Sequence, residues 1–179
     1  MKSSGVFVAL GSNLNLREKN LSAALELLSH NPAISICRMS AVYETAPKYN
    51  PGQPKFLNMV VEITTSLTPL QLLEFCKDIE VRLGRHFPHF KNSPREIDLD
   101  IIFFNRLIVE SPTLTIPHPG LYERKFVLVP LAEIAPEFIC PKTAKSVAEL
   151  LRICPDIEQV VRIGQLDELL TIPVTTGVL

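Results

Sequence analysis

Residues 93–104 read SPREIDLDIIFF, a run that is apolar enough to form a buried strand and yet carries two aspartates. Strand side chains alternate between the two faces of a sheet, so Asp98 and Asp100 point the same way. The opposite face receives Ile97, Leu99 and Ile101. Two carboxylates that share a half-buried face repel each other and lose hydration. The pattern therefore predicts a compensating positive charge, either a bound cation or a guanidinium such as that of Arg95.

Upstream of this strand, three further runs of apolar and β-branched residues predict strands at residues 5–10, 34–45 and 56–65. The residues after the first run predict a helix that ends near His30 to Pro32. Its apolar face carries Leu21, Ala24, Leu25 and Leu28. A proline-rich loop, APKYNPGQPK, separates the second run from the third.

A second helix is predicted to begin at Thr68, which is followed by Pro69 in the first turn and by Gln71 at the capping-box position. Gly84 is placed to end this helix. The predicted apolar stripe is Leu70, Leu73, Cys76, Ile79 and Leu83. The resulting order is βαββαβ, the split βαβ or ferredoxin-like arrangement. The predicted fold class is therefore α+β, an antiparallel sheet with two helices packed on one face.

Downstream of residue 104 the signals are shorter. A turn of helix is predicted around Gly120 to Arg124, followed by a strand or helix that packs on the same core. Ser146 and Glu149 form a second capping-box signature before the short helix VAELLRI. QVVRI, residues 159–163, is a candidate strand. We expect a single domain over residues 1–179, with a core at about 5–154 and a C-terminal extension of uncertain role at 155–179.

Composition argues against several classes of function. Lys and Arg total 18 against 19 Asp and Glu, so the balanced charge offers no field to hold nucleic acid or an anionic membrane. No run of residues suits a membrane span or a signal-peptide core. The four cysteines form no C-x-x-C pair, which argues against a zinc site and predicts reduced, mostly buried thiols. We therefore expect a cytoplasmic protein without nucleic-acid or membrane partners.

Several residues near loops have the chemistry of a phosphate site. No G-x-x-x-x-G-K-S/T motif is present, so a phosphate-handling protein of this kind must use side chains and metal. The candidate cations are Arg85, Lys91, Arg95, His118, Arg124 and Lys125. Phe56 and Phe126 stand at the starts of apolar runs that border loops, and Asn58 shares a strand face with Phe56. A buried amide needs hydrogen-bond partners, which a flat heterocycle would supply.

Many of these residues belong to longer motifs. Residues 94–102 fit a P-R-x-x-D-L-D-x-x signature. The other motifs are ALGSN at 9–13, YET-x-P at 43–47, FLN at 56–58, E-x-x-x-G-R at 80–85, TIPH at 115–118 and R-x-F at 124–126. In this order and spacing they resemble the motifs of 6-hydroxymethyl-7,8-dihydropterin pyrophosphokinase, an enzyme family of the folate pathway. The resemblance covers roughly residues 5–140.

The resemblance implies a ferredoxin-like domain that transfers the terminal pyrophosphate of ATP to the pterin hydroxymethyl group, with two Mg²⁺ ions. Asp98 and Asp100 resemble the metal ligands and, with Arg85 and Arg95, the catalytic residues. The residues implied for pterin are Thr45, Pro47, Phe56, Asn58 and Phe126. Those implied for ATP are Glu80, Arg85, Arg95, His118 and Arg124. Some family members are fused to dihydropteroate synthase, so the resemblance implies that enzyme as a linked or neighbouring partner.

Two departures from the family pattern concern the loop before Pro94. The family commonly has tryptophan and glycine where this chain has Asn92 and Ser93. A second basic residue of that loop is replaced near Phe87 and Pro88. These changes leave the metal site intact and bear on how the loop closes over substrates.

The residues by themselves also fit three other interpretations. Both aspartates would face solvent if they lay on an open side of the sheet. A metal-dependent nuclease or nucleotidyltransferase also uses paired aspartates on a strand, and it would require a basic track for the polynucleotide. A non-catalytic module on the same fold would bind pterin without ATP or Mg²⁺ and would produce no AMP.

Overall fold

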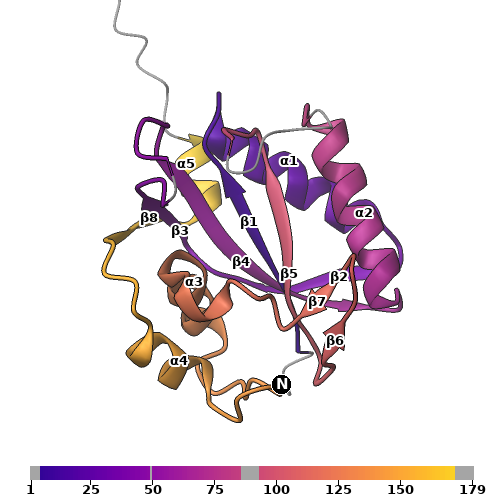
Figure 1. Ribbon diagram of the computed structural model, residues 1–179. Helices are drawn as coiled ribbons and strands as arrows, with labels where there is room; N and C mark the ends of the chain where they lie inside the picture. The colour runs from indigo at the N-terminus through magenta and orange to yellow at the C-terminus, as the bar shows by residue number, and fades with distance from the viewer. Residues whose placement is uncertain (1–4, 49, 86–92, 172–179) are drawn as a thin grey trace, which may run out of the picture.

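The computed structural model describes residues 5–48, 50–85 and 93–171, and it is an α+β structure built on one large antiparallel sheet (Figure 1). The elements in chain order are β1 (Val6–Ser12), α1 (Arg17–His30), β2 (Ile34–Met39), β3 (Val42–Thr45), β4 (Phe56–Thr65), α2 (Pro69–Arg82), β5 (Asp98–Phe104), β6 (Val109–Glu110), β7 (Thr115–Ile116), the 3₁₀ helix η1 (Leu121–Glu123), α3 (Lys125–Ile134), α4 (Val147–Ile153), β8 (Val160–Gly164) and α5 (Leu166–Thr171). The strand order is β5-β1-β4-β3-β8, and β2 also pairs with β4. Lys91 and the predicted departures at Phe87, Pro88 and Asn92 lie outside the described residues.

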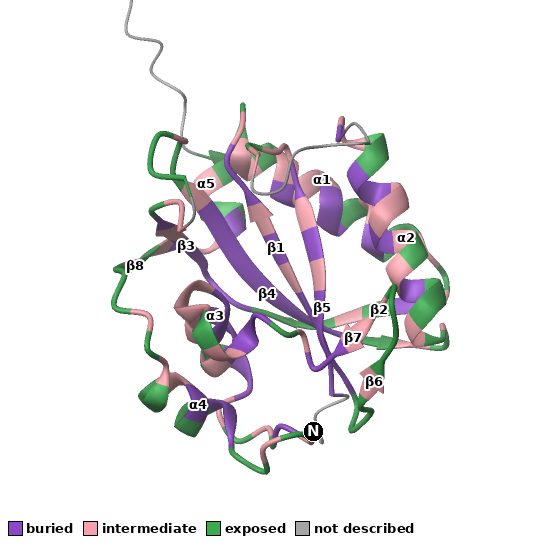
Figure 2. Cartoon of the chain, in the orientation of Figure 1, coloured by how far each residue is buried: buried purple, intermediate pink, exposed green. Residues whose placement is uncertain are grey.

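Helices cover both faces of the sheet. α1 and α2 pack on one face, and α3 packs on the other with α4 beside it (Figure 1). The alternation along β1 explains this division, because Val8 and Leu10 enter the core under α1 and α2 whereas Phe7 enters the core under α3. Buried residues accordingly run along the central strands in Figure 2. The second helical layer comes from the segment that follows β5.

The predicted start and end of the second helix are confirmed, but its apolar stripe is shifted. Thr68 caps α2 in a capping box with Gln71, and Gly84 follows the helix with a φ of +105°. Leu70 is 51% exposed, whereas Leu72 is fully buried. At 100° per residue, Leu70 points away from the face that holds Cys76 and Ile79, and Leu72 points toward that face. The stripe therefore begins two residues later than predicted.

The predicted strand at 34–45 is two strands, which pair with different halves of β4. Buried Ser40 lies at the break between them. Its backbone N–H donates to the carbonyl oxygen of Val60 at 2.9 Å, and its hydroxyl accepts from the N–H of Val60 at 2.9 Å. The hydroxyl replaces a ladder partner, so the chain bends without leaving a buried donor unpaired.

The C-terminal extension contributes to the sheet and to one helical layer. β8 lies near the predicted strand at 159–163 and pairs antiparallel with β3, while α5, which the sequence signals did not predict, packs against α1. Within the described residues no helix is long and apolar enough to cross a membrane. All four cysteines are free, and Cys76 and Cys140 are buried as expected. Cys37 is exposed, and it lies at an irregularity in the pairing of β2 with β4.

Candidate active site

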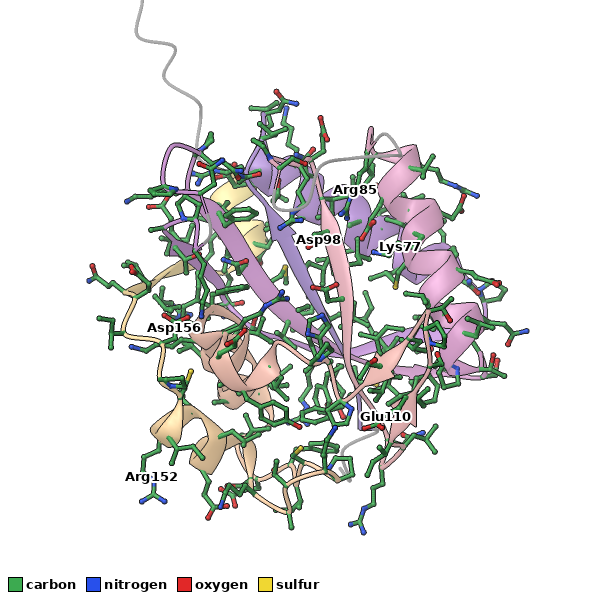
Figure 3. The ribbon with its side chains drawn as sticks, viewed as in Figure 1. Lys77, Arg85, Asp98, Glu110, Arg152 and Asp156 are labelled. Atoms are coloured by element: carbon green, nitrogen blue, oxygen red, sulfur yellow. The ribbon has the colours of Figure 1, made fainter. Side chains whose placement is uncertain are left out.

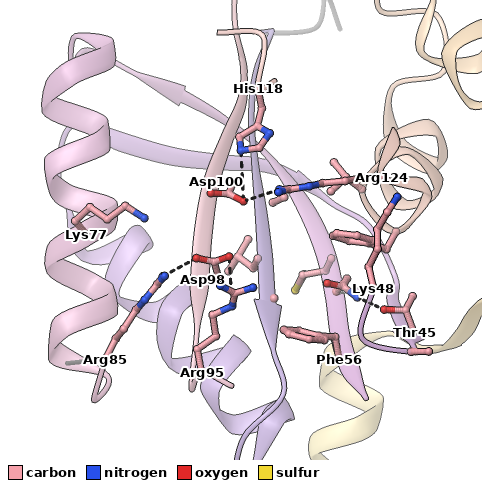
Figure 4. A pocket seen from close by; sticks show the side chains of 18 residues that line it. Thr45, Lys48, Phe56, Lys77, Arg85, Arg95, Asp98, Asp100, His118 and Arg124 are labelled. Atoms are coloured by element: carbon pink, nitrogen blue, oxygen red, sulfur yellow. Dashed lines mark hydrogen bonds and ion pairs between the residues drawn. The ribbon is translucent and has the colours of Figure 1, made fainter. Parts of the chain in front are cut away.

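A cavity of about 290 Å³ lies on the α3 face of the sheet, over β1, β4 and β5 and beside the start of α3 (Figure 4). Ala9, Leu10 and Gly11 line it from β1, and the small side chains of Ala9 and Gly11 leave room for a ligand. All of the predicted site residues except Pro47 and Glu80 line the cavity. Those that do are Thr45, Phe56, Asn58, Arg85, Arg95, Asp98, Asp100, His118, Arg124 and Phe126. The fold thus gathers residues from motifs that lie far apart in the sequence.

Asp98 and Asp100 face the cavity from β5, as the alternation predicts, and Asp98 lies between two guanidinium groups. Arg85 Nη1 lies 2.5 Å from Asp98 Oδ1, and Arg95 Nε lies 3.5 Å from Asp98 Oδ2. Burial raises the pKa of Asp98, but the charges of Arg95 and Arg85 outweigh burial and hold that pKa below its ordinary value. The predicted compensating charge is present, and Arg85 supplies it together with Arg95.

Asp100 is held by longer contacts. Arg124 Nη1 lies 3.5 Å and His118 Nε2 lies 3.7 Å from Asp100 Oδ2. Burial and the negative charge of Asp98 raise the pKa of Asp100. The backbone N–H of Gly120 donates to His118 Nδ1 at 3.0 Å, so the neutral ring carries its proton on Nε2, toward Asp100. The protein therefore compensates Asp98 more fully than Asp100.

A buried carboxylate on α2 orients the cations on the Asp98 side of the cavity. Glu80 is fully buried, and its Oε1 accepts hydrogen bonds from the backbone N–H of Leu99 and from Lys77 Nζ, both at 2.8 Å. Its Oε2 lies 2.7 Å from Arg85 Nη1. Lys77 and Arg85 consequently extend from the α2 side toward Asp98 (Figure 4). Glu80 lies behind them and does not line the cavity, so its contact with ATP stays a prediction.

The sequence assigned no role to three side chains at the cavity, although one of them, Asn13, belongs to the ALGSN motif. Lys77 and Lys48 line the cavity, and Asn13 braces Arg95. The side-chain oxygen of Asn13 accepts from the backbone N–H of Arg95 at 2.8 Å, and the N–H of Asn13 donates to the carbonyl oxygen of Arg95 at 3.2 Å. Lys77 could have been found from its place one helical turn before Glu80. No comparable sequence signal marks Lys48.

Two aromatic rings line the part of the cavity farther from Asp98 and Asp100. Phe56 belongs to β4 and Phe126 to the first turn of α3. The guanidinium carbon of Arg95 lies 5.5 Å from the centroid of Phe56, and that of Arg124 lies 6.0 Å from the centroid of Phe126. Neither ring is fully buried. Both aromatic faces therefore adjoin a cation and remain accessible to a flat ligand.

A hydrogen-bonding edge accompanies the aromatic rings. The side-chain amide of Asn58 is buried, and its Nδ2 donates to Thr45 Oγ1 at 2.8 Å. Gly11 faces Asn58 across β1 and β4, and a Cβ at that position would come within 3.1 Å of Asn58 Oδ1. Pro47 lies on the loop after β3 and outside the cavity lining. At this side of the cavity, the amide of Asn58 and the neighbouring backbone are therefore the groups that can form hydrogen bonds with a ligand.

The donor set of the cavity fits a hard cation that arrives with a phosphate. Within the described residues no group of three His, Cys, Asp or Glu is placed to hold a metal ion. Asp98 and Asp100 nevertheless place two carboxylates in one space, and their repulsion is compensated unequally. Mg²⁺ usually binds through one or two carboxylates and completes its coordination with substrate phosphates and water.

Comparison with known proteins finds matches over most of the chain. The family model described as 7,8-dihydro-6-hydroxymethylpterin-pyrophosphokinase matches residues 7–136. The Bacillus subtilis protein 2-amino-4-hydroxy-6-hydroxymethyldihydropteridine pyrophosphokinase is 48% identical over 128 residues, which are 72% of this chain and 76% of that protein. The protein of the same name from Pseudomonas aeruginosa is 37% identical over 84% of this chain and 91% of its own length.

Longer proteins match as well. The Schizosaccharomyces pombe folic acid synthesis protein fol1 is 39% identical over 86% of this chain, but this chain spans only 21% of its length. Among solved structures, the wild-type Plasmodium falciparum HPPK-DHPS crystallised with SDX-DHP superposes with a TM-score of 0.61 at 19% identity, over 82% of this chain and 43% of that one. At that identity the superposition supports the fold.

Proposed function

The chain belongs to the 7,8-dihydro-6-hydroxymethylpterin-pyrophosphokinase family of ATP-dependent diphosphotransferases, and we propose that it catalyses this transfer in folate biosynthesis. In the proposed reaction, the hydroxymethyl oxygen of 6-hydroxymethyl-7,8-dihydropterin attacks the β-phosphorus of ATP. The terminal pyrophosphate moves to the pterin, and AMP leaves. The observation that carries the proposal is the place of Asp98 and Asp100, which lie in one cavity with two phenylalanine rings and five lysine and arginine side chains.

The aromatic part of the cavity is the proposed pterin site. Phe56 and Phe126 would stack on the two faces of the bicyclic pterin, and each phenylalanine would bury one face of it. Asn58 and the backbone from Thr45 to Pro47 would read the donors and acceptors on the edge of the pterin. This orientation directs the hydroxymethyl group toward the carboxylates. A pterin held in this way reacts as part of a bound pair, which removes much of the entropic cost of a bimolecular encounter.

The cationic part is the proposed triphosphate site. Arg85, Arg95 and Arg124 are already held near Asp98 and Asp100, and phosphate oxygens would replace part of their contacts with those carboxylates. His118 would donate from Nε2, whose proton is fixed there by the bond that Nδ1 accepts. Such preorganised donors stabilise the charge that develops on the transferred group without moving during the reaction.

Asp98 and Asp100 are the proposed ligands of Mg²⁺, and two ions are expected because the family resemblance implies two. Bound there, Mg²⁺ would neutralise phosphate charge and help align the reacting groups. The two carboxylates contribute their fixed position on β5, since the strand is paired to β1 and the backbone N–H of Leu99 on its outer edge donates to Glu80. Neutral replacements at either position would remove the charge that a cation requires.

Three broader expectations belong with this proposal. We infer a ferredoxin-like core, which the order β5-β1-β4 followed by β2 and β3 supports. We also propose a cytoplasmic location, in keeping with four free cysteines. The Plasmodium falciparum structural neighbour is an HPPK-DHPS protein, which supports a linked or neighbouring dihydropteroate synthase as partner.

The proposal is tested by measuring nucleotide products from ATP, Mg²⁺ and 6-hydroxymethyl-7,8-dihydropterin. We expect AMP, formed only when the pterin is present. The Asp98→Asn and Asp100→Asn variants, with the same shape and without the charge, should each lose turnover by roughly a thousandfold or more. Formation of ADP, or pterin binding that needs neither ATP nor Mg²⁺ and gives no AMP, would reject the proposed activity.

A further inference from the structure

Asp156 lies in the C-terminal extension, beyond the residues that the family model matches, yet it contacts two walls of the cavity. Its Oδ2 accepts hydrogen bonds from Lys48 Nζ at 2.9 Å and from the backbone N–H of Lys125 at 3.2 Å. Its Oδ1 accepts from the backbone N–H of Glu158 at 3.1 Å. Only 4% of the Asp156 side chain is exposed. A carboxylate this buried, with three donors, is held in a single position.

The two segments that Asp156 joins both carry the proposed pterin site. Lys48 lines the cavity from the loop after β3, three residues beyond Thr45. Lys125 begins α3 and is followed directly by Phe126. Lys48 Nζ also donates to the carbonyl oxygen of Glu123, next to the start of α3. Figure 3 places Asp156 beside α3, and Figure 4 shows Lys48 extending toward that helix.

Asp156 also supplies an N-terminal cap to α3, which has no capping side chain of its own. No side chain of the segment that leads into α3 caps the N-terminus of the helix. The carboxylate of Asp156 accepts from the first N–H of α3 and places a negative charge at the positive end of the helix. The same oxygen accepts from Lys48, so the position of Phe126 and the position of the loop after Thr45 depend on one atom.

We propose that Asp156 is a positioning residue that sets the separation between Phe126 and the loop at Thr45 to Lys48, and thereby the width of the pterin site. The inference rests on the proposed function, since it assigns the pterin to the space between these walls. Removing the charge of Asp156 weakens its hold on both Lys48 and the start of α3, and leaves Lys48 with the carbonyl oxygen of Glu123. Pterin binding then weakens, while Asp98 keeps its contacts with Arg85 and Arg95, because the hydrogen bonds of Asp156 go to Lys48, Lys125 and Glu158.

The test compares steady-state constants of the full chain and four variants. Asp156→Asn is nearly isosteric, and Lys48→Met keeps the aliphatic stem while removing the ammonium. Asp156→Asn combined with Lys48→Met tests whether the two residues act through one another. The matched control is Glu110→Gln, which breaks the exposed Lys142–Glu110 pair, also 2.9 Å long. Melting temperature is measured for every variant.

The expected result is a rise of about tenfold in the KM for pterin in Asp156→Asn and in Lys48→Met, as for loss of one charged hydrogen bond. The KM for ATP should stay within about twofold, and the double variant should be no worse than the more affected single variant. Glu110→Gln should match the parent chain. A lower melting temperature with an unchanged pterin KM in both single variants would show that Asp156 only anchors the extension and would overturn the inference. Absence of AMP formation by the parent chain would instead reject the proposed function.

Discussion

Asp98 and Asp100 are equivalent by sequence pattern, but the charges around them differ, so their replacement by asparagine should affect stability unequally. The repulsion between two carboxylates on one strand face would, by itself, make either change preserve or raise stability. The structure limits this expectation to Asp100, because Asp98 has guanidinium partners at 2.5 and 3.5 Å. We predict that, without Mg²⁺ and ATP, Asp98→Asn is the less stable variant.

The expected change in the free energy of unfolding follows from the charges that each variant leaves unpaired. Breaking a buried ion pair costs roughly 3 to 5 kcal/mol when one charge is left without compensation. Arg85 keeps Glu80 at 2.7 Å, and the Asp98 side chain is 20% exposed, which limits the loss for Asp98→Asn. We therefore expect a loss of about 1 to 2 kcal/mol in the free energy of unfolding. The contacts of Asp100 are 3.5 and 3.7 Å long, so Asp100→Asn should change stability by between zero and a gain of about 1 kcal/mol.

The assay is urea denaturation at neutral pH with a chelator and without nucleotide. With unchanged m values, the midpoint of Asp98→Asn should lie below that of Asp100→Asn. The gap should shrink in concentrated salt, although less than for an exposed pair. Equal midpoints, or a lower midpoint for Asp100→Asn, would refute the assignment of Arg85 and Arg95 as the charges that compensate Asp98.

Three other predictions address the remaining parts of the molecule. Phe56→Ala and Phe126→Ala should each weaken pterin binding by about 1 to 3 kcal/mol and leave ATP binding nearly unchanged, and normal pterin binding by a folded variant in calorimetry would assign that ring to the core. Lys77→Met should weaken ATP binding by about tenfold without changing pterin binding, which titration with an ATP analogue can measure, and an unaltered ATP affinity would limit Lys77 to pairing with Glu80. Burial and the hydrogen bond to Glu133 raise the pKa of Tyr43 to about 12, so the unfolded chain loses this proton first as pH rises above the ordinary value of 10.0. The free energy of unfolding should therefore fall between these pH values. Denaturation measured at several pH values should show a smaller fall for Tyr43→Phe, and an equal fall in both proteins would contradict this assignment.

Local sequence signals predicted those features of the fold that are determined locally. The capping boxes at Thr68 and Ser146 are present because each needs only one turn of helix. Strand alternation placed Asp98 and Asp100 on one face for the same reason. The family motifs contain most of the residues that line the cavity, but not Lys48 or Lys77.

The features that were missed depend on contacts between distant segments. The division of residues 34–45 into two strands depends on Ser40 meeting Val60. The pairing of Glu80 with Leu99 depends on α2 lying along the free edge of β5. Asp156 bonds to Lys48 only when the C-terminal extension packs beside the loop after β3. No residue pattern within one segment indicates such contacts.

In the proposed reaction both terminal phosphates of ATP move together to the pterin, and the mass of the pterin product after a single turnover shows directly whether they do. We predict a pterin that has gained two phosphate groups, formed in equal amount with AMP and dependent on Mg²⁺. A pterin with one added phosphate, formed together with ADP, or an unmodified pterin recovered from a complex that contains ATP and Mg²⁺, would contradict the account.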